Sequence, residues 1–278
     1  MSCFEIVIVS YNTCQLLHEC LRSLDQQTGP TWRAIVVDNG SIDDSVPMVR
    51  EHFPATLVIA VNKNLGFAAG VNRGLASASA PYVLLLNSDA TLQAGALAAL
   101  HARLETEPSI GLLAARLFNL DGSPQPSCVP RHFPWTYSSP ERSCDLRWAS
   151  AAALVVRRTC LETIGSLDEN FFYTGEDCDW CLRARRAGWR VALEPAAEVI
   201  HRGAVTRRQL PKLAAESLHL GRQYFFAKHY GRWGKAYARC HSVVELLGLT
   251  LRRPRPERAF YLGLLRRTLA YRPEIERG

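Results

Sequence analysis

The chain has 278 residues, and its 47% hydrophobic and 21% charged composition is ordinary for a folded protein. The net charge of +7 is uneven, because residues 1–200 hold 16 Lys or Arg against 21 Asp or Glu, and residues 201–278 hold 17 against 5. This confinement of basic charge to the C-terminal region argues against a nucleic-acid-binding protein.

Cysteine usage and the N-terminus indicate the compartment. The nine cysteines are an odd, scattered set, which favours free thiols in a reducing compartment. The pair Cys178 and Cys181 has no second pair at zinc-finger spacing, so we expect two ordinary cysteines on a helix. The N-terminus lacks the basic region of a signal peptide, and no apolar stretch approaches the ~20 residues of a membrane span. We therefore expect a cytoplasmic protein.

The first part of the chain alternates between short apolar runs and amphipathic segments. Apolar runs without polar alternation suit strands that are buried on both faces of a parallel sheet. This alternation predicts right-handed βαβ units and a mostly parallel α/β sheet. In chain order, the expected strands cover residues 4–10, 32–38, 56–61 and 82–87, and the expected helices cover 13–24, 43–52, 68–78 and 92–105.

The pattern changes after Pro108. Residues 121–147 are rich in Pro, Ser and Arg and read as a long loop, which in a compact domain is usually functional or mobile. From residue 206 the pattern is helical and basic, so we expect a catalytic domain over 1–205 and a helical region over 206–278. Further expected strands cover residues 111–119, 148–158 and 189–195, and further helices cover 159–164 and 176–188.

Two of the apolar runs lead to carboxylates: the run over 32–38 ends at Asp38, and Asp89 follows the run over 82–87. Ligands of open α/β sheets collect at the carboxyl ends of such strands. One acid can hold a ribose and the other a metal ion on a diphosphate, which predicts a nucleotide-dependent enzyme. Tyr11 follows the first strand, where it either stacks on a base or caps the core. Asp38 on its own fits a ribose contact or a turn cap equally well.

The segment over residues 64–74, NLGFAAGVNRG, holds three glycines, which permit close approach of the backbone to a ligand. It lacks the Gly-Lys-Ser/Thr ending of a Walker loop and does not match G-x-G-x-x-G, which counts against a P-loop ATPase and a dinucleotide enzyme. Within it, Asn72 is the preferred nucleotide contact, with a helix-start role as the alternative.

Six motifs follow one another along the chain: SYN at 10–12, VVDNGSIDD at 36–44, the glycine-rich segment at 64–74, LLLNSDA at 84–90, SLDENFFYTGEDCDWCLRARRAGW at 166–189 and EVIHRG at 198–203. In this order they resemble family 2 inverting glycosyltransferases of the GT-A fold, in the rhamnosyltransferase-like branch. The resemblance spans about residues 4–205 and implies a Rossmann-like, mostly parallel sheet flanked by helices, to which the sequence pattern adds a basic helical C-terminal extension.

The resemblance implies a donor site with a metal ion. Asp38 matches an acid that contacts the nucleoside, which favours the ligand role. Asn87-Ser88-Asp89 stands in place of the family's D-x-D metal motif, with Asn at its first position. Asp89 would be the principal ligand of Mg²⁺ or Mn²⁺, since phosphate and water fill most other positions of such ions. His201 matches a histidine that completes the metal site in related enzymes.

The resemblance also implies the catalytic base and the acceptor side. Asp177, with Glu176 beside it, matches the carboxylate that takes the proton of the acceptor hydroxyl in inverting transfer. The alternative is that these acids only complement the dipole of a helix start. Trp148 stands where relatives place a Trp beside the acceptor, although Ala151 replaces their usual Gly. An ion pair is expected for Asp179 with Arg183, and burial for Trp180.

The resulting expectation is a metal-dependent enzyme of cell-surface polysaccharide or glycolipid synthesis. It would move a sugar, with rhamnose as one option, from a dTDP- or UDP-sugar to a saccharide or polyprenyl-linked acceptor. The basic C-terminal region either rests on an anionic membrane surface, at its inner face, or packs as a helical subdomain. No nucleic-acid partner is expected. The alternatives are a catalytically inactive sugar-nucleotide sensor or scaffold and, ranked lower, a sugar-nucleotide nucleotidyltransferase.

Overall fold

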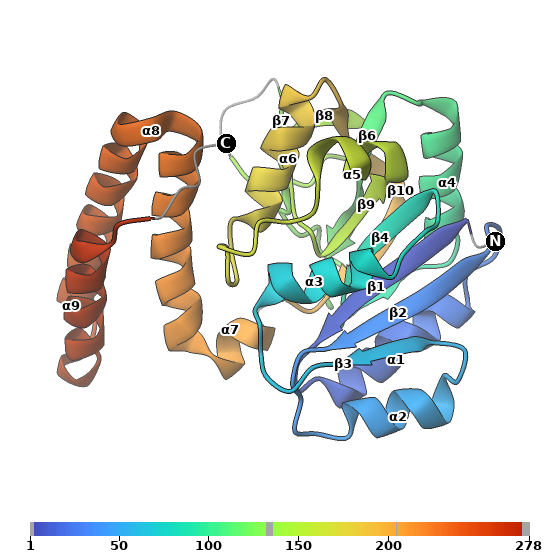
Figure 1. Cartoon of the computed structure of the whole chain (residues 1–278), viewed down its shortest axis with the longest axis horizontal. Coiled ribbons are helices and arrows are strands. Elements are labelled where there is room, and N and C mark those ends of the chain that lie inside the picture. The colour runs from blue at the N-terminus through green and yellow to red at the C-terminus, as the bar shows by residue number, and fades with distance from the viewer. Residues whose placement is uncertain (1–2, 132–135, 204, 274–278) are drawn as a thin grey trace. The chain divides into compact units, whose positions relative to one another are not determined.

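The computed structural model describes residues 3–131, 136–203 and 205–273, and its chain divides into two compact units (Figure 1). The first unit comprises residues 1–169 and 176–205, and the second comprises residues 170–175 and 206–278. The segment 170–175 thus belongs to the second unit, although it lies between two parts of the first in the sequence.

Four parallel strands form the first half of the sheet, in the order β3-β2-β1-β4. All four were predicted from their apolar runs, and β1, β2 and β4 are almost wholly buried, as expected for central strands. Their bounds are β1 Phe4–Ser10, β2 Trp32–Asp38, β3 Leu57–Ala60 and β4 Tyr82–Asn87.

The second half of the sheet is mixed. Strand β9 (Ala153–Arg157) lies antiparallel between β4 and β6 (Ile110–Phe118), and β10 (Arg190–His201) lies parallel to β6. The remaining strands β5 (Ala90–Leu92) and β8 (Cys144–Ala149) both pair antiparallel with β10, and β7 (Cys128–Pro130) extends the sheet beyond β8. The predicted α/β class with a mostly parallel central sheet is confirmed.

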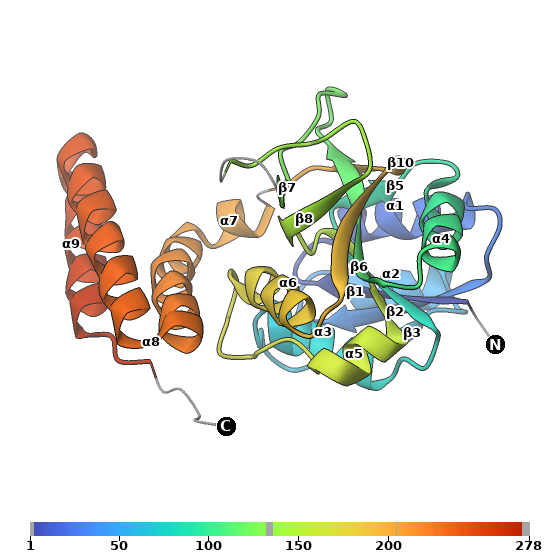
Figure 2. The ribbon, with the colours of Figure 1, turned by 90° about the horizontal axis from the view of Figure 1, so that it is seen from above.

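Helices cover both faces of this sheet in the described part of the first unit (Figure 2). Successive strand residues point to opposite faces, so Ile6 and Ile8 join one core and Val7 joins the other. The first core is covered by α1 (Cys14–Asp25), α2 (Ser45–His52) and α4 (Ala96–Thr106). The second is covered by α3 (Phe67–Ala76), α5 (Arg158–Ile164) and α6 (Glu176–Arg186).

Three predictions of elements differ from the structure. The single strand expected over 148–158 is two strands, because residues 150–152 turn between β8 and β9. The helix expected over 92–105 begins later, because residues 90–92 form β5 and Gly95 adopts a left-handed φ of +81° before α4. The long loop expected over 121–147 contains β7 and the first residues of β8.

The second unit is helical. It holds most of α7 (Val205–Gln209), together with α8 (Pro211–Arg252) and α9 (Arg255–Ala270). Gly231, with a φ of +62°, interrupts α8 and divides it into two arms, which Arg222 and Glu245 join by a 2.7 Å ion pair (Figure 1). Among the residues described, none of the helices combines the length and apolar character required to cross a bilayer.

Candidate functional site

The carboxyl ends of β1, β2 and β4 meet at one edge of the sheet. Ser10 pairs in register with Asp38, and Val9 pairs with Asn87. This register brings the three predicted motifs around residues 10–12, 38–44 and 87–89 together. A chain of hydroxyl hydrogen bonds from Ser10 through Thr13 to Ser88, of 2.9 and 3.0 Å, ties the first motif to the third.

The turn after β1 is bonded to the turn after β2. Asn12 has a φ of +52°, its backbone N–H donates to Ser41 Oγ at 2.9 Å, and its Oδ1 accepts the N–H of Ile42 at 2.8 Å. Tyr11 is half-buried in this turn, beside the loop that Asp38 begins. Asn12 and Ser41 were missed by sequence reasoning, which assigned a role only to their neighbours.

Asp38 carries an unpartnered buried oxygen. Asp38 is only 3% exposed, and its Oδ2 accepts the backbone N–H of Ser41 at 3.1 Å. Oδ1 is buried and has no hydrogen-bond partner in the described part of the chain. A buried carboxylate oxygen without a donor is costly, so this atom is suited to accept a hydrogen bond from a ligand hydroxyl or N–H.

The glycine-rich segment is held against this edge by Asn39. Its Nδ2 donates to the Gly66 carbonyl at 3.0 Å and to Asn64 Oδ1 at 3.1 Å, and its Oδ1 accepts the N–H of Leu65 at 3.0 Å. Gly66 adopts a φ of +89° at the start of α3. The sequence motif pointed to the glycines, whereas the residue that fixes their position is the buried Asn39.

Asn72 uses its amide within the protein. Its Nδ2 donates to the Leu167 carbonyl at 2.8 Å and to Glu169 Oε1 at 2.9 Å, and its Oδ1 accepts the Leu167 N–H at 3.0 Å. These bonds join α3 to the segment that leads toward α6. The nucleotide contact predicted for Asn72 stays a prediction, and it competes with these three bonds.

The predicted metal ligands lie side by side. His201 Nε2 is 3.3 Å from Asp89 Oδ1 and 3.2 Å from Asn87 Nδ2. Strand β5 brings this about, because Ala90 pairs with His201 and the Arg202 N–H donates to the Asp89 carbonyl at 3.0 Å. Residues separated by more than a hundred positions thus form one cluster.

Gln125 orients the His201 ring. His201 Nδ1 lies 2.8 Å from Gln125 Oε1, and Gln125 Nε2 donates to Asn119 Oδ1 at 2.9 Å and to the His201 carbonyl at 3.2 Å. Because the amide N–H groups of Gln125 are used elsewhere, its oxygen accepts from Nδ1–H, and this bond turns Nε2 of the ring toward Asp89. No sequence pattern pointed to Gln125, which stands in the expected loop.

The donor set fits a divalent cation. Two atoms 3.3 Å apart can both ligate one ion with bonds of about 2.1 Å, and Mg²⁺ and Mn²⁺ accept carboxylate oxygen readily. Within the described residues there is no group of three or more His, Cys, Asp or Glu that could hold a metal by itself. An ion at Asp89 and His201 would therefore take its other ligands from phosphate and water.

The carboxylate of Asp177 lies at the first turn of α6, next to the same edge. Burial raises its pKa, while the side chain of Trp148 and the backbone of Cys178 and Ala151 lower it. The Cys178 N–H donates to Asp177 Oδ1 at 2.7 Å. The carbonyl of Ala152, the residue after Ala151, accepts the Asn87 N–H at 3.0 Å. The turn beside Asp177 is thus bonded to the metal motif.

Glu176 differs from Asp177 in its surroundings. It is 5% exposed, and its Oε2 is buried without a hydrogen-bond partner in the described part of the chain. Burial, and then the charge of Asp177, raise its pKa well above the usual range. Burial therefore favours the protonated form of Glu176, which is unable to accept a proton.

The other residues of α6 have structural contacts. Arg183 Nε donates to Asp179 Oδ2 at 2.7 Å, which confirms the expected ion pair. Trp180 is fully buried, as expected, and its Nε1 donates to the Gly165 carbonyl at 2.9 Å. Cys178 and Cys181 are free cysteines on the helix.

Residues 5–152 of the chain match the family model "Glycosyl transferase family 2". An N-acetylglucosaminyl-diphospho-decaprenol L-rhamnosyltransferase of Mycobacterium tuberculosis is 27% identical over 265 residues, covering 83% of this chain and 86% of the relative. A pre-mycofactocin glycosyltransferase of the same species is 31% identical over 186 residues, covering 61% of this chain and 37% of the relative.

Solved structures share the fold at low identity. TarS of S. aureus matches with a TM-score of 0.65 and 17% identity over 99% of this chain, and the chain spans 50% of that structure. The mannosyltransferase PcManGT of Pyrobaculum calidifontis, solved with GDP-Man and Mn²⁺, matches with a TM-score of 0.60 and 17% identity, covering 96% of this chain and 87% of the other.

Proposed function

The chain belongs to glycosyl transferase family 2, and from this premise we propose a metal-dependent inverting transfer of a sugar from a nucleotide diphosphate to a saccharide hydroxyl. The observation that carries the proposal is the shared edge of the sheet. Three features lie at this edge, on segments that hydrogen bonds connect: the unpartnered Oδ1 of Asp38, the Asp89–His201 pair and the Asp177 carboxylate. In the proposal, this edge would supply a nucleoside contact, a diphosphate contact and a base.

In the proposed donor site, Asp38 Oδ1 accepts a hydrogen bond from the nucleoside and Tyr11 offers a stacking face. The donor would be a dTDP- or UDP-sugar. Rhamnose is supported by the name of the mycobacterial relative, which is 27% identical, and UDP by a structure of TarS in complex with UDP. Asn87 adds an amide beside the diphosphate, whereas the bonds of Asn72 favour a positioning role.

Asp89 and His201 would hold Mg²⁺ or Mn²⁺, with Gln125 fixing the histidine ring. When bound, the ion neutralises the negative charge that grows on the leaving diphosphate. The protein then needs no general acid at the leaving group. Support for a metal comes from this donor pair and from the Mn²⁺ named with PcManGT.

Asp177 acts as the general base in this proposal. The acceptor hydroxyl oxygen forms a bond to the anomeric carbon as the bond from that carbon to the diphosphate oxygen breaks, and Asp177 takes the hydroxyl proton. Attack from the side opposite the leaving group inverts the anomeric configuration. The raised pKa of Asp177 brings its basicity closer to the working pH, which suits a base. Glu176, predicted as a second catalytic acid, would remain a neutral neighbour.

The acceptor would lie beside Trp148, whose side chain lowers the pKa of Asp177 and packs edge-on against Tyr137 at 5.2 Å between ring centroids. We place a polyprenyl-linked saccharide here, as in the name of the mycobacterial relative. The second unit would meet an anionic membrane surface from the cytoplasmic side. Trp233 and Tyr237 are 74% and 58% exposed among many basic residues, a combination typical of interfacial helices.

The Asp177→Asn variant tests the proposal. The amide keeps the shape of the carboxylate and cannot take a proton, so the rate constant of transfer should fall about 10²–10⁴-fold. Binding of the matching dTDP- or UDP-sugar with Mn²⁺, measured by calorimetry, should change less than twofold. Asp25→Asn, an exposed acid at the end of α1, serves as the matched control.

Three outcomes would contradict parts of this assignment. Normal turnover by Asp177→Asn removes Asp177 as the base. Loss of donor binding in the same variant moves Asp177 into the donor site. Donor binding by the unaltered protein without any transfer to saccharide acceptors would favour the alternative of a sugar-nucleotide sensor.

A further inference from the structure

The second arm of α8, which follows the interruption at Gly231, carries an exposed apolar stripe. Its members are Cys240, Val244, Leu247 and Leu251, and the last three are 72%, 45% and 77% exposed. The steps between them are four, three and four residues, which places all four side chains within about 60° around an α-helix. Contiguous apolar strips on a protein surface typically mark a contact with another surface.

The inner face of this arm is less apolar than the stripe. Ser242 and Thr250 are buried there beside Leu246, and Ser242 Oγ has no hydrogen-bond partner in the described part of the chain. Thr250 Oγ1 donates to the Leu246 carbonyl of its own helix at 2.7 Å. A surface helix normally turns its apolar side toward the core. Because two hydroxyl groups lie inside this arm and the stripe lies outside, we expect a covering surface that this copy of the chain does not supply.

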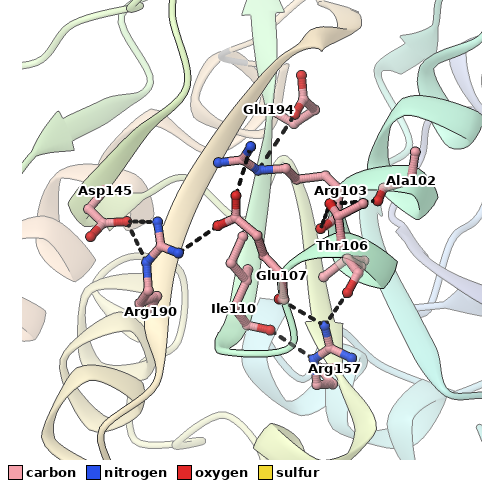
Figure 3. A network of polar contacts seen from close by, with 10 residues as sticks. Ala102, Arg103, Thr106, Glu107, Ile110, Asp145, Arg157, Arg190 and Glu194 are labelled. Atoms are coloured by element: carbon pink, nitrogen blue, oxygen red, sulfur yellow. Dashed lines mark hydrogen bonds and ion pairs between the residues drawn. The ribbon is translucent and has the colours of Figure 1, made fainter.

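Charge limits which surface can cover the stripe. In the first unit, basic side chains meet acids, and the Arg190 guanidinium lies between Asp145, at 2.7 Å, and Glu107 (Figure 3). Residues 201–278 hold 17 Lys or Arg against 5 Asp or Glu, so pairing of this kind leaves that region with a net charge of +12. Two such regions repel each other wherever their basic residues meet.

The stripe lies in the part of this region that has the least positive charge. Residues 240–251 contain no Lys or Arg, which is the longest such stretch in residues 201–278. Arg232, Lys235 and Arg239 instead accompany the aromatic residues at the start of the arm. An anionic bilayer holds apolar faces that basic side chains flank. The charge pattern therefore suits a bilayer at the start of the arm and an uncharged protein surface at the stripe.

A second helix with the same stripe meets these requirements. Alternating steps of three and four residues form the seam along which two helices interlock their side chains. Three of the four positions that flank the stripe are uncharged, namely Val243, Gly248 and Thr250. His241 is at the fourth, where its Nδ1 lies 3.6 Å from Glu245. Two copies can therefore approach here without bringing like charges together. Four side chains cover less than the about 800 Å² per partner of a standard interface, so the pair should be weak and reversible.

We propose that two copies of this chain pair through the stripe. Each copy contributes the same four residues, so the contact is isologous and closes at two copies. The steps of four, three and four residues read the same in both directions, so Cys240 lies opposite either Cys240 or Leu251 of the second copy. The pairing does not depend on the proposed function, because the residues of the proposed donor site and the proposed base are in the first unit.

Analytical ultracentrifugation of the full chain over a range of concentrations tests the pairing. Val244→Ser combined with Leu251→Ser should weaken self-association at least tenfold, because hydroxyl groups replace half of the stripe. Leu57→Ser with Leu120→Ser, two exposed apolar residues of the first unit, is the matched control and should change self-association less than twofold. Equal self-association of the two variants overturns the proposal. A chain that stays monomeric at submillimolar concentration also overturns it, and weaker vesicle binding by the Val244 and Leu251 variant would then assign the stripe to lipid.

Cross-linking provides a second measurement, which does not depend on removing the stripe. Cys240 is the exposed cysteine among the described residues. A short bismaleimide should join two copies of the unaltered protein if the paired helices run parallel. If they run antiparallel, it should join two copies of Leu251→Cys through positions 240 and 251. Cys240→Ser with Leu120→Cys moves the reactive thiol to the first unit and should link only as fast as random collision allows. Links through position 240 that form no faster than in this control overturn the proposal.

Discussion

Asp177 and Glu176 are adjacent in the chain, yet Asp177 is better suited than Glu176 to be ionised in the enzyme. Burial raises the pKa of both, and the Trp148 side chain and the backbone of Cys178 and Ala151 act in the opposite direction on Asp177. The base must be deprotonated, so activity should fall as the pH drops through the raised pKa of Asp177. We expect the acid limb of kcat/KM above the ordinary Asp value of about 3.9.

The Glu176→Gln variant is the companion of this pH measurement. The amide imitates the protonated acid, so turnover should stay within a few-fold and the acid limb should not move.

The effect of Glu176 on the stability of the folded protein has a definite sign. The folded state keeps the Glu176 proton that the unfolded state loses, so stability falls as pH rises from the unfolded pKa toward the raised folded pKa.

Urea denaturation at a series of pH values checks the sign. The free energy of unfolding of Glu176→Gln relative to the unaltered protein should rise from pH 4 to pH 8. A difference that is flat with pH, or an acid limb that moves to lower pH in the variant, would mean that Glu176 is ionised in the folded protein.

Gln125 is expected to act through His201. Replacing Gln125 with Leu removes two hydrogen bonds: the one that Gln125 Oε1 accepts from His201 Nδ1–H and the one that Gln125 Nε2 donates to the His201 carbonyl. Residues that orient a ligating histidine usually contribute about 10–100-fold to metal affinity. The affinity for Mn²⁺ in the presence of UDP should fall by that factor, measured by calorimetry. Gln15→Leu, an exposed glutamine of α1, is the control, and equal affinities in both variants would remove Gln125 from the metal site.

At the residue scale, the sequence predicted the carboxylates that lie at or just beyond the ends of strands. Asp38 and Asp89 were foreseen because an apolar run stops at a carboxylate, and the topology places such ends together. Gln125 and the backbone of Ala151 could not be foreseen, since their contacts depend on how β7 and β9 return to the sheet. Asn72 shows the converse, because a plausible motif residue has its amide bonded within the protein.

At the element scale, the turn after β2 depends on Gly40. This residue has a φ of +81°, and a Cβ there would lie 2.7 Å from the Lys63 backbone. Gly95 has the same φ with nothing within 4 Å of the added atom, so it is a matched control. Gly95→Ala should lose about 1–2 kcal/mol of unfolding free energy from the left-handed conformation alone.

Gly40→Ala should lose more than Gly95→Ala, because Lys63 must also move. Guanidinium denaturation compares the two. We also expect weaker UDP binding in Gly40→Ala, since the turn carries the bonds that hold Asp38. Equal losses of stability in the two variants would show that the Lys63 backbone gives way freely.

The helices and strands of the first half were predictable, and those of the second half were less so. Long apolar runs such as β1 and β4 identify buried strands by composition alone. The short strands β5 and β7 have three residues each and exist only because a longer strand lies beside them. Such pairings are tertiary effects, which local patterns do not encode.

At the scale of the whole molecule, the sequence located the change of composition near residue 205. It did not reveal that a short segment from the middle of the chain belongs to the second unit. Residues 170–175 belong to the second unit, where the Phe171 ring meets Tyr224 edge-on at 5.0 Å and Asn170 donates to the Tyr224 hydroxyl at 3.1 Å. The helix that carries Asp177 begins directly after this segment. The chain therefore passes from the second unit straight into the helix of the proposed base.

The exposed aromatic residues of the second unit give the prediction that concerns the whole molecule. Trp233 lies beside Arg232, whose guanidinium is 5.2 Å from the Trp ring centroid, and Tyr237 follows one turn later on the same arm of α8. If this arm meets an anionic bilayer, both rings enter its interface while the basic residues meet the headgroups. Trp233→Ser with Tyr237→Ser should weaken binding to vesicles of phosphatidylglycerol and phosphatidylcholine at least tenfold.

Binding should also weaken as salt rises, because the Debye length falls from about 10 Å at 0.1 M to about 3 Å at 1 M. Leu57→Ser with Leu120→Ser replaces two exposed apolar residues of the first unit and should leave vesicle binding unchanged. Co-sedimentation with vesicles measures all three proteins. If the aromatic pair and the leucine pair lose the same amount, the contact is not located on α8. If the vesicles do not bind the unaltered protein, the acceptor must reach the enzyme without a membrane contact from the second unit.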